Sequence, residues 1–99
     1  MSRFTRIASF TVDPEQRDDV LAAYGAYASE VAADDDVIAW EIGSDAENRN
    51  VLHIVATFPG VEAYERHMSA DATAAVMAVL QPALVGTPSF FQLDAHHVA

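Results

Sequence analysis

Runs of strand-like residues alternate along this chain with longer stretches in which apolar residues recur at helical spacing. Four segments of strand length are rich in β-branched and aromatic side chains, and we predict strands at residues 5–12, 37–43, 51–58 and 89–96. In the second segment, Ile38, Trp40 and Ile42 point one way and Glu41 the other. The polar stretch 44–50 suits a hairpin, so the second and third strands should pair antiparallel.

Two helical regions fall between these strands. Asp13 is a good N-cap and Pro14 suits a first helical position, with Gln16 placed as in a capping box, so the first helix should start there. Its predicted apolar stripe is Val20, Leu21, Tyr24, Tyr27, Ala28 and Val31. The second region should break at residues 69–71 and end at Gly86, after a stripe of Val76, Val79, Leu80 and Leu84.

The order strand, helix, strand, strand, helix, strand is that of the split βαβ arrangement. We therefore predict one domain over residues 1–99, of the α+β class, with a ferredoxin-like βαββαβ fold and an antiparallel sheet. Both helical regions should cover one sheet face. We expect Ile7 and the row of Trp40 on the opposite face, where a second copy would cover them and form a homodimer.

Composition excludes several kinds of chemistry. The chain has no Cys and its five basic residues are all Arg, so thiolate, disulfide, Schiff-base and P-loop lysine chemistry are excluded. A net charge of −10 disfavours nucleic acid as a partner. No apolar run reaches the roughly 18 residues of a membrane span and no signal peptide is evident, so we expect a cytoplasmic protein without a membrane partner.

Cofactor and metal sites are not indicated either. The four glycines are scattered singly, so no dinucleotide fingerprint exists and we expect no cofactor. The acidic run Asp34–Asp36 is typical of a solvated loop. Asp94, His96 and His97 have a generic spacing near the end of the chain, so we predict no metal site.

The segment Thr57–Ser69 (TFPGVEAYERHMS) resembles the antibiotic biosynthesis monooxygenase domain family, whose members are small dimeric α+β barrels. In that family a strand ending in an aromatic residue leads into a helix with the pattern E-A-x-x-x-H, followed by a Ser-rich break. The resemblance extends over nearly the whole chain, from Asp13-Pro14-Glu15 to the Leu-x-Gly-x-Pro run at 84–88. It implies a fold, while the family's activities include cofactor-free oxygenation of quinols and anthrones, haem degradation and isomerase-like reactions.

Departures from the family patterns narrow these activities. Ala8 and Met77 fall where the haem-degrading branch has an Asn and a haem-ligating His, which argues against haem degradation. Tyr64 matches a Tyr of the anthrone-oxidising branch, whereas Phe58 and Ile54 stand where that branch has its other pocket residues.

The resemblance points to a cofactor-independent monooxygenase with a small aromatic substrate, such as a quinol, phenol or anthrone-like compound, and O₂. A deprotonated phenol or enol reacts with oxygen, so a general base in an apolar pocket can suffice. His67 is the candidate base, and Tyr64, one helical turn earlier, a candidate hydrogen-bond donor.

Four further residues are candidates to line the substrate pocket, namely Trp40, His53, Phe58 and Glu41. Two other hypotheses remain open. One is a non-catalytic binding module, in which His67 ties the helix end to a strand and Tyr64 fills the core. The other is a proton-transfer isomerase, which needs the same base but no oxygen.

Overall fold

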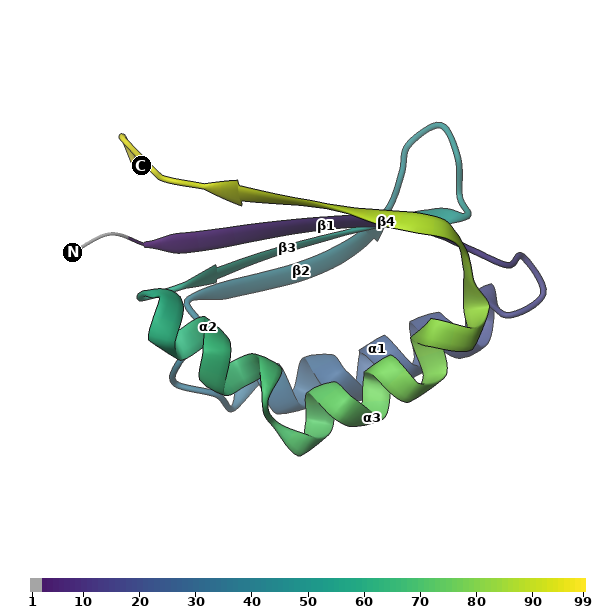
Figure 1. Ribbon diagram of the computed structural model, residues 1–99, viewed down its shortest axis with the longest axis horizontal. Helices are drawn as coiled ribbons and strands as arrows, with labels where there is room; N and C mark the ends of the chain where they lie inside the picture. Colours follow the sequence, from purple (N-terminus) through teal and green to yellow (C-terminus); the bar gives the residue numbers. More distant parts are fainter. Residues whose placement is uncertain (1–2) are drawn as a thin grey trace.

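The computed structural model describes residues 3–99 and contains a four-stranded antiparallel sheet with all helices packed on one face (Figure 1). The elements in chain order are β1 (Phe4–Val12), α1 (Arg17–Ala32), β2 (Ala39–Ser44), β3 (Val51–Phe58), α2 (Val61–Met68), α3 (Asp71–Leu80), the 3₁₀ turn η1 (Gln81–Ala83) and β4 (Leu84–Leu93). The strand order β2-β3-β1-β4 confirms the predicted ferredoxin-like fold.

Alternation along the strands decides which side chains meet the helices. On β1, Phe10 and Val12 are buried on the helix side, and Leu52, Ala56 and Phe58 do the same on β3. The helices contribute Val20, Tyr24, Tyr27 and Val31 from α1, and Thr73, Val76 and Leu80 from α3. The predicted stripe of α1 is thus confirmed. Val79 is 40% exposed because it lies beyond the edge of the buried arc of α3.

The first helix begins later than predicted. Asp13 Oδ1 accepts a hydrogen bond from the Glu15 N–H at 2.9 Å, and the Asp13 carbonyl accepts one from the Gln16 N–H at 3.0 Å. These bonds form a turn over residues 14–16, and α1 starts only at Arg17. Asp13 therefore stabilises a turn that precedes the helix, not the helix terminus itself.

The last strand begins earlier than predicted, at Leu84 instead of Ser89. Gly86 was expected to end a helix, but it lies inside β4 with φ +75°. The pairing of β4 with β1 shifts register between Ser9 and Thr11, close to this glycine. Gly86 thus supplies the left-handed backbone conformation that an irregular strand needs there.

Trp40 does not lie on the open sheet face as predicted. Its ring packs against Tyr24 and Tyr27 of α1, at centroid distances of 6.2 and 5.6 Å, so it belongs to the helix-covered face. Successive side chains of a strand point to opposite faces. Arg6 and Ala8 face the helices, so Ile7 between them lies on the open face, as predicted. Alternation separates a strand into two rows, but it does not say which row the helices cover.

Among residues 3–99, no helix is long and apolar enough to cross a membrane.

Candidate functional site

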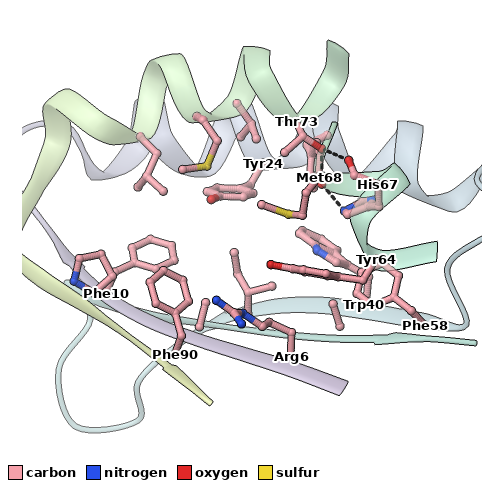
Figure 2. A pocket seen from close by; sticks show the side chains of 18 of the residues that line it. Arg6, Phe10, Tyr24, Trp40, Phe58, Tyr64, His67, Met68, Thr73 and Phe90 are labelled. Carbon is pink, nitrogen blue, oxygen red and sulfur yellow. Dashed lines mark hydrogen bonds between the residues drawn. The ribbon is translucent and has the colours of Figure 1, made fainter. Parts of the chain in front are cut away.

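A cavity of about 220 Å³ lies between the sheet and the helices (Figure 2). Its floor consists of the helix-facing residues of the strands, which are Arg6, Ala8, Phe10, Trp40, Ile54, Ala56, Phe58, Pro88 and Phe90. Its roof consists of residues from the three helices and of Leu84, the first residue of β4. The helix residues are Tyr24, Tyr27, Tyr64, His67, Met68, Thr73, Val76, Met77 and Leu80. Most of these side chains are apolar, so the cavity suits a flat hydrophobic ligand.

Aromatic rings enclose the end of the cavity nearest α2. Phe58 contacts Tyr64 edge-on at a centroid distance of 5.4 Å and lies 5.1 Å from the His67 ring. Tyr27 meets Trp40 edge-on at 5.6 Å. Such tilted and edge-to-face pairs hold rings in fixed orientations, so this wall is rigid and shaped for an aromatic guest.

Arg6 and the Tyr64 hydroxyl bring polar atoms to the cavity. The Arg6 guanidinium carbon lies 4.7 Å from the Phe90 ring centroid and 5.5 Å from that of Tyr64. In Figure 2 the guanidinium extends from β1 into the cavity, and the Tyr64 hydroxyl points into the same space. Met68 is 45% and Phe90 55% exposed, so the mouth of the cavity lies between these two side chains.

The Tyr24 hydroxyl is a third polar group on the wall (Figure 2). Burial, together with the neighbouring Tyr27, raises the pKa of Tyr24 to about 12, so this hydroxyl keeps its proton at neutral pH. Within the described part of the chain no residue hydrogen-bonds to it. It is therefore a donor that a ligand oxygen can use.

His67 is buried and held by side chains from three other segments. Its Nε2 is hydrogen-bonded to the Tyr27 hydroxyl, and its Nδ1 lies 3.5 Å from Asp34 Oδ2. The Tyr27 oxygen is 3.1 Å from Thr73 Oγ1, and the Thr73 hydroxyl donates to the His67 carbonyl at 2.7 Å. We call these four residues the His67 network.

The His67 network can hold one proton more or fewer without moving its heavy atoms. With a neutral imidazole, Nδ1–H faces Asp34, the Tyr27 hydroxyl donates to Nε2, and Thr73 donates to the carbonyl. With an imidazolium, Nε2–H donates to the Tyr27 oxygen and the Tyr27 hydroxyl turns to Thr73. Every donor has an acceptor in both states, which is the property that a proton-accepting site needs.

Tyr27 lines the cavity, as His67 does, and its hydroxyl is hydrogen-bonded to His67 Nε2. Burial raises the pKa of Tyr27, and the charge of Asp34 adds to this, while the hydrogen bond with Thr73 opposes it. The hydroxyl therefore remains protonated at neutral pH and can pass a proton on, but it is not itself the base.

The acidic run at 34–36 is a loop with Asp35 exposed, as predicted, and its other two carboxylates contact α2. Asp36 accepts two hydrogen bonds from Arg66, Nε to Oδ2 at 2.8 Å and Nη2 to Oδ1 at 3.0 Å. This bidentate pair lowers the pKa of Asp36. Together with the Asp34 contact, it fixes the α1–β2 connection beside His67.

Four of the sequence-predicted site residues line the cavity, namely Trp40, Phe58, Tyr64 and His67. His53 and Glu41 do not line it, because their strand positions have the opposite parity to Ile54 and Trp40. His53 instead accepts a hydrogen bond from Ser9 and donates one to Asp45, both at 2.8 Å, and Glu41 is exposed. Among residues 3–99, no three His, Asp or Glu side chains converge as metal ligands would.

Arg6, Tyr24, Tyr27 and Thr73 were missed as site residues. Arg6 shares its parity on β1 with Phe10, and this was the available signal that its side chain faces the helices. The two tyrosines lie in the predicted stripe of α1, where a polar hydroxyl on a buried face calls for a partner or a ligand.

Comparison with known proteins identifies one family and many similar folds. The model of the antibiotic biosynthesis monooxygenase family matches residues 3–79. No curated protein matches the chain. A Caulobacter crescentus structure superposes with a TM-score of 0.91 at 18% identity, covering 97% of this chain and 92% of that one.

Rv0793 from Mycobacterium tuberculosis gives a TM-score of 0.90 at 18% identity, with 99% of both chains covered. An antibiotic biosynthesis monooxygenase gives 0.88 at 16% identity, covering 93% of this chain and 97% of its own. At these identities the structural likeness establishes the fold alone.

Proposed function

The chain belongs to the antibiotic biosynthesis monooxygenase family, and from this we propose that it oxidises a small aromatic phenol or enol with O₂, without a cofactor. The observation that carries the proposal is the apolar cavity with the His67 network at its wall. A base and a water-poor pocket are what such a substrate needs to react with oxygen.

The size of the cavity limits the substrate. A cavity of about 150 Å³ is large enough for benzene. The cavity here, at about 220 Å³, therefore accommodates one aromatic ring with substituents or two fused rings. We propose a monocyclic or bicyclic substrate and not a three-ring anthrone.

His67 is the proposed base, and it acts through Tyr27. The substrate hydroxyl donates to the Tyr27 oxygen while the Tyr27 proton moves to His67 Nε2, so the negative charge develops on the substrate and the positive charge on His67. Asp34 faces the other ring nitrogen and stabilises the imidazolium. Tyr64 and Tyr24 offer hydroxyl donors to the phenolate oxygen.

The substrate itself supplies the electrons in this scheme. For a phenol with a hydrogen on its para carbon, the phenolate passes one electron to O₂, and the two radicals combine to form a carbon–peroxide bond at that carbon. The peroxide then takes the proton from His67. Loss of the ring C–H proton then breaks the O–O bond, leaving a quinone and releasing water. One phenol and one O₂ give one quinone and one H₂O, with no external reductant.

We also propose that the protein works as a homodimer whose copies meet through the open sheet face. Ile7 pairs with Val55 on one side and Phe91 on the other, so these three side chains form an apolar row across β3, β1 and β4. Phe91 is 59% and Leu93 52% exposed in the single chain, and a second copy would remove this surface from water.

Oxygen uptake tests the proposed function. Purified protein is given a panel of monocyclic and bicyclic quinols and phenols, and uptake is compared between wild type and His67→Gln. We expect H67Q to lower kcat by about 10² to 10⁴. His53→Gln is the matched control, because His53 lies on the other sheet face, and it should retain activity.

Three outcomes separate the hypotheses. Turnover that depends on oxygen and on His67 supports the monooxygenase. Turnover of an enolisable substrate that persists without oxygen would instead indicate a proton-transfer isomerase. Binding without turnover in either condition would leave the fold as a binding module, and the proposed oxidation would be wrong.

A further inference from the structure

We propose that the site selects aromatic substrates that carry a carboxylate, and that Arg6 binds this carboxylate at the mouth of the cavity. The inference deepens the proposed function by naming its substrate class, and for the reaction itself it rests on that function. The juxtaposition that carries it is one unpaired guanidinium beside an otherwise apolar cavity.

Arg6 has no acceptor in its surroundings. No carboxylate lines the cavity, and no residue of the described chain forms an ion pair or hydrogen bond with the Arg6 side chain. By contrast, Arg17 is bonded to a backbone carbonyl, Ser44 and Asp18, and Arg66 to Asp36. The Arg6 nitrogens are not fully buried, so water can hydrate them in the free protein. A carboxylate would replace this water with charge-assisted hydrogen bonds.

The surrounding aromatic rings hold the Arg6 guanidinium in a position from which it can bind a carboxylate. Phe90 and Tyr64 both lie within about 6 Å of it, which is the range of cation–π contact. These contacts restrict the Arg6 side chain without using its N–H donors, which remain free for a ligand. Arginine's planar fork matches the two oxygens of a carboxylate, so a bidentate pair can form there.

The shape and lining of the rest of the cavity limit which group can carry the carboxylate. Beyond Arg6, the cavity is enclosed by the rings of Phe10, Tyr24 and Trp40 and by the methionines of α2 and α3. An aromatic ring fits this region, with its phenolic oxygen directed at the His67 network and its carboxylate at Arg6. A phosphate ester is less suited, because its second negative charge would have only one guanidinium to pair with.

The net charge of the protein does not favour an anionic ligand. The chain carries fifteen acidic residues against five arginines, so an anion gains nothing from the overall field of the protein. At physiological ionic strength this field is screened beyond about 8 Å, and local contacts decide binding. Of the described residues that line the cavity, Arg6 alone carries a guanidinium, so we expect a preference for an acid to depend on it.

Isothermal titration calorimetry with two matched ligand pairs tests the inference. The pairs are 4-hydroxybenzoate with 4-hydroxybenzamide, and 6-hydroxy-2-naphthoate with 6-hydroxy-2-naphthamide. Each amide has nearly the shape of its acid but no charge. We expect the better-fitting acid to bind wild type about 10 to 100 times more tightly than its amide, as for a charge-assisted hydrogen bond.

Arg6→Gln should reduce this preference to about twofold or less while the amide's affinity stays within about threefold. Arg3→Gln removes the same charge at an exposed position before β1 and should preserve the preference. Should R6Q not fold, Arg6→Lys retains the charge without the fork, and it should lose most of the preference.

Two results would overturn the inference. They are equal affinities of acid and amide for wild type, or an acid preference that survives in R6Q. Neither result would contradict the proposed oxidation, because oxygen uptake with neutral phenols tests that reaction separately. If neither member of either pair binds wild type, the carboxylate site is wrong and so is the use of this cavity for small phenols.

Discussion

A single tyrosine hydroxyl joins the cavity to its buried histidine. Tyr27 presents its oxygen to both His67 and Thr73, and its ring packs against Trp40. A phenylalanine could supply that packing, so the hydroxyl is there for its hydrogen bonds. In the proposed reaction the same atom would serve both proton transfer and stability, and the two contributions can be measured separately.

Tyr27→Phe retains the ring and leaves His67 Nε2 without its partner. Because a buried polar group loses its hydrogen bond, the free energy of unfolding should fall by about 1–3 kcal/mol. The proposed proton path is also interrupted, so kcat for an oxidised phenol should drop by about 10² or more. Urea unfolding and oxygen uptake measure the two effects.

Tyr24→Phe is the matched control for stability, since the Tyr24 hydroxyl has no partner among residues 3–99. Its free energy of unfolding should change by less than about 0.5 kcal/mol. An equal loss of stability in both variants would show that the Tyr27 hydroxyl is not a member of a buried network.

Two carboxylates make the stability dependent on acid pH. The hydrogen bonds from Arg66 lower the pKa of Asp36, and the one from His53 lowers the pKa of Asp45. In each case the folded pKa lies below the unfolded value of about 4, so the unfolded chain binds more protons in between. This stabilisation is present above about pH 4 and is lost as the pH falls through the folded pKa.

Asp36→Asn should therefore flatten the decline of unfolding free energy between about pH 4 and pH 2, which urea titrations at several pH values would show. Asp35→Asn is the control, because Asp35 is exposed and is not a partner in the Arg66 pair. An equal slope for wild type and D36N would contradict a role for the Arg66 pair in acid stability.

The residues that sequence could predict differ from those it could not in one respect. His67 and Tyr64 stand in a recognisable pattern on one helix, so the helical spacing placed them together. Arg6 and Thr73 reach the cavity from β1 and α3, and only the packing of the helices on the sheet brings them to it. Strand alternation places Arg6 in one row with Phe10, but it does not say that this row meets the helices.

At the scale of elements, strand alternation predicted which side chains of a strand point the same way, but not which of the two sets faces the helices. It correctly separated Trp40 from Glu41, yet Trp40 faces the helices and His53 does not. Helix ends were likewise harder to predict than helix centres. The stripe of α1 follows from hydrophobic spacing, whereas its start at Arg17 depends on the turn that Asp13 forms.

Two glycines in different elements should respond oppositely to alanine. Gly86 in β4 has φ +75°, and a Cβ there would touch nothing within 4 Å, so Gly86→Ala should cost about 1–2 kcal/mol through backbone strain alone. Gly25 lies exposed within α1, and a Cβ there also meets nothing. Gly25→Ala should stabilise the protein by about 0.5–1 kcal/mol.

Chemical denaturation of the two variants measures this difference. The pair is informative because neither substitution creates a clash, so the sign depends on backbone conformation only. A G86A variant as stable as wild type would mean that the irregularity in β4 relaxes without cost.

For the whole molecule, the two faces of the sheet differ in what they carry. The covered face contains the cavity, and the open face carries the apolar row of Ile7, Val55 and Phe91. Because adjacent residues of β4 point to opposite faces, Phe90 belongs to the cavity mouth and Phe91 to the open face. The same substitution at these neighbours can therefore test dimerisation independently of the site.

Phe91→Asp should convert the proposed dimer to a monomer. Burying a phenylalanine is worth about 1.5–3 kcal/mol, and a twofold interface contains the residue twice, so the dissociation constant should rise by roughly 10² or more. Phe90→Asp makes the same chemical change on the other face and should remain dimeric in sedimentation velocity. With a net charge of −10 on each copy, added salt should strengthen the wild-type dimer. A monomeric wild type at micromolar concentration, or dissociation by F90D as strong as by F91D, would contradict assembly through the open face.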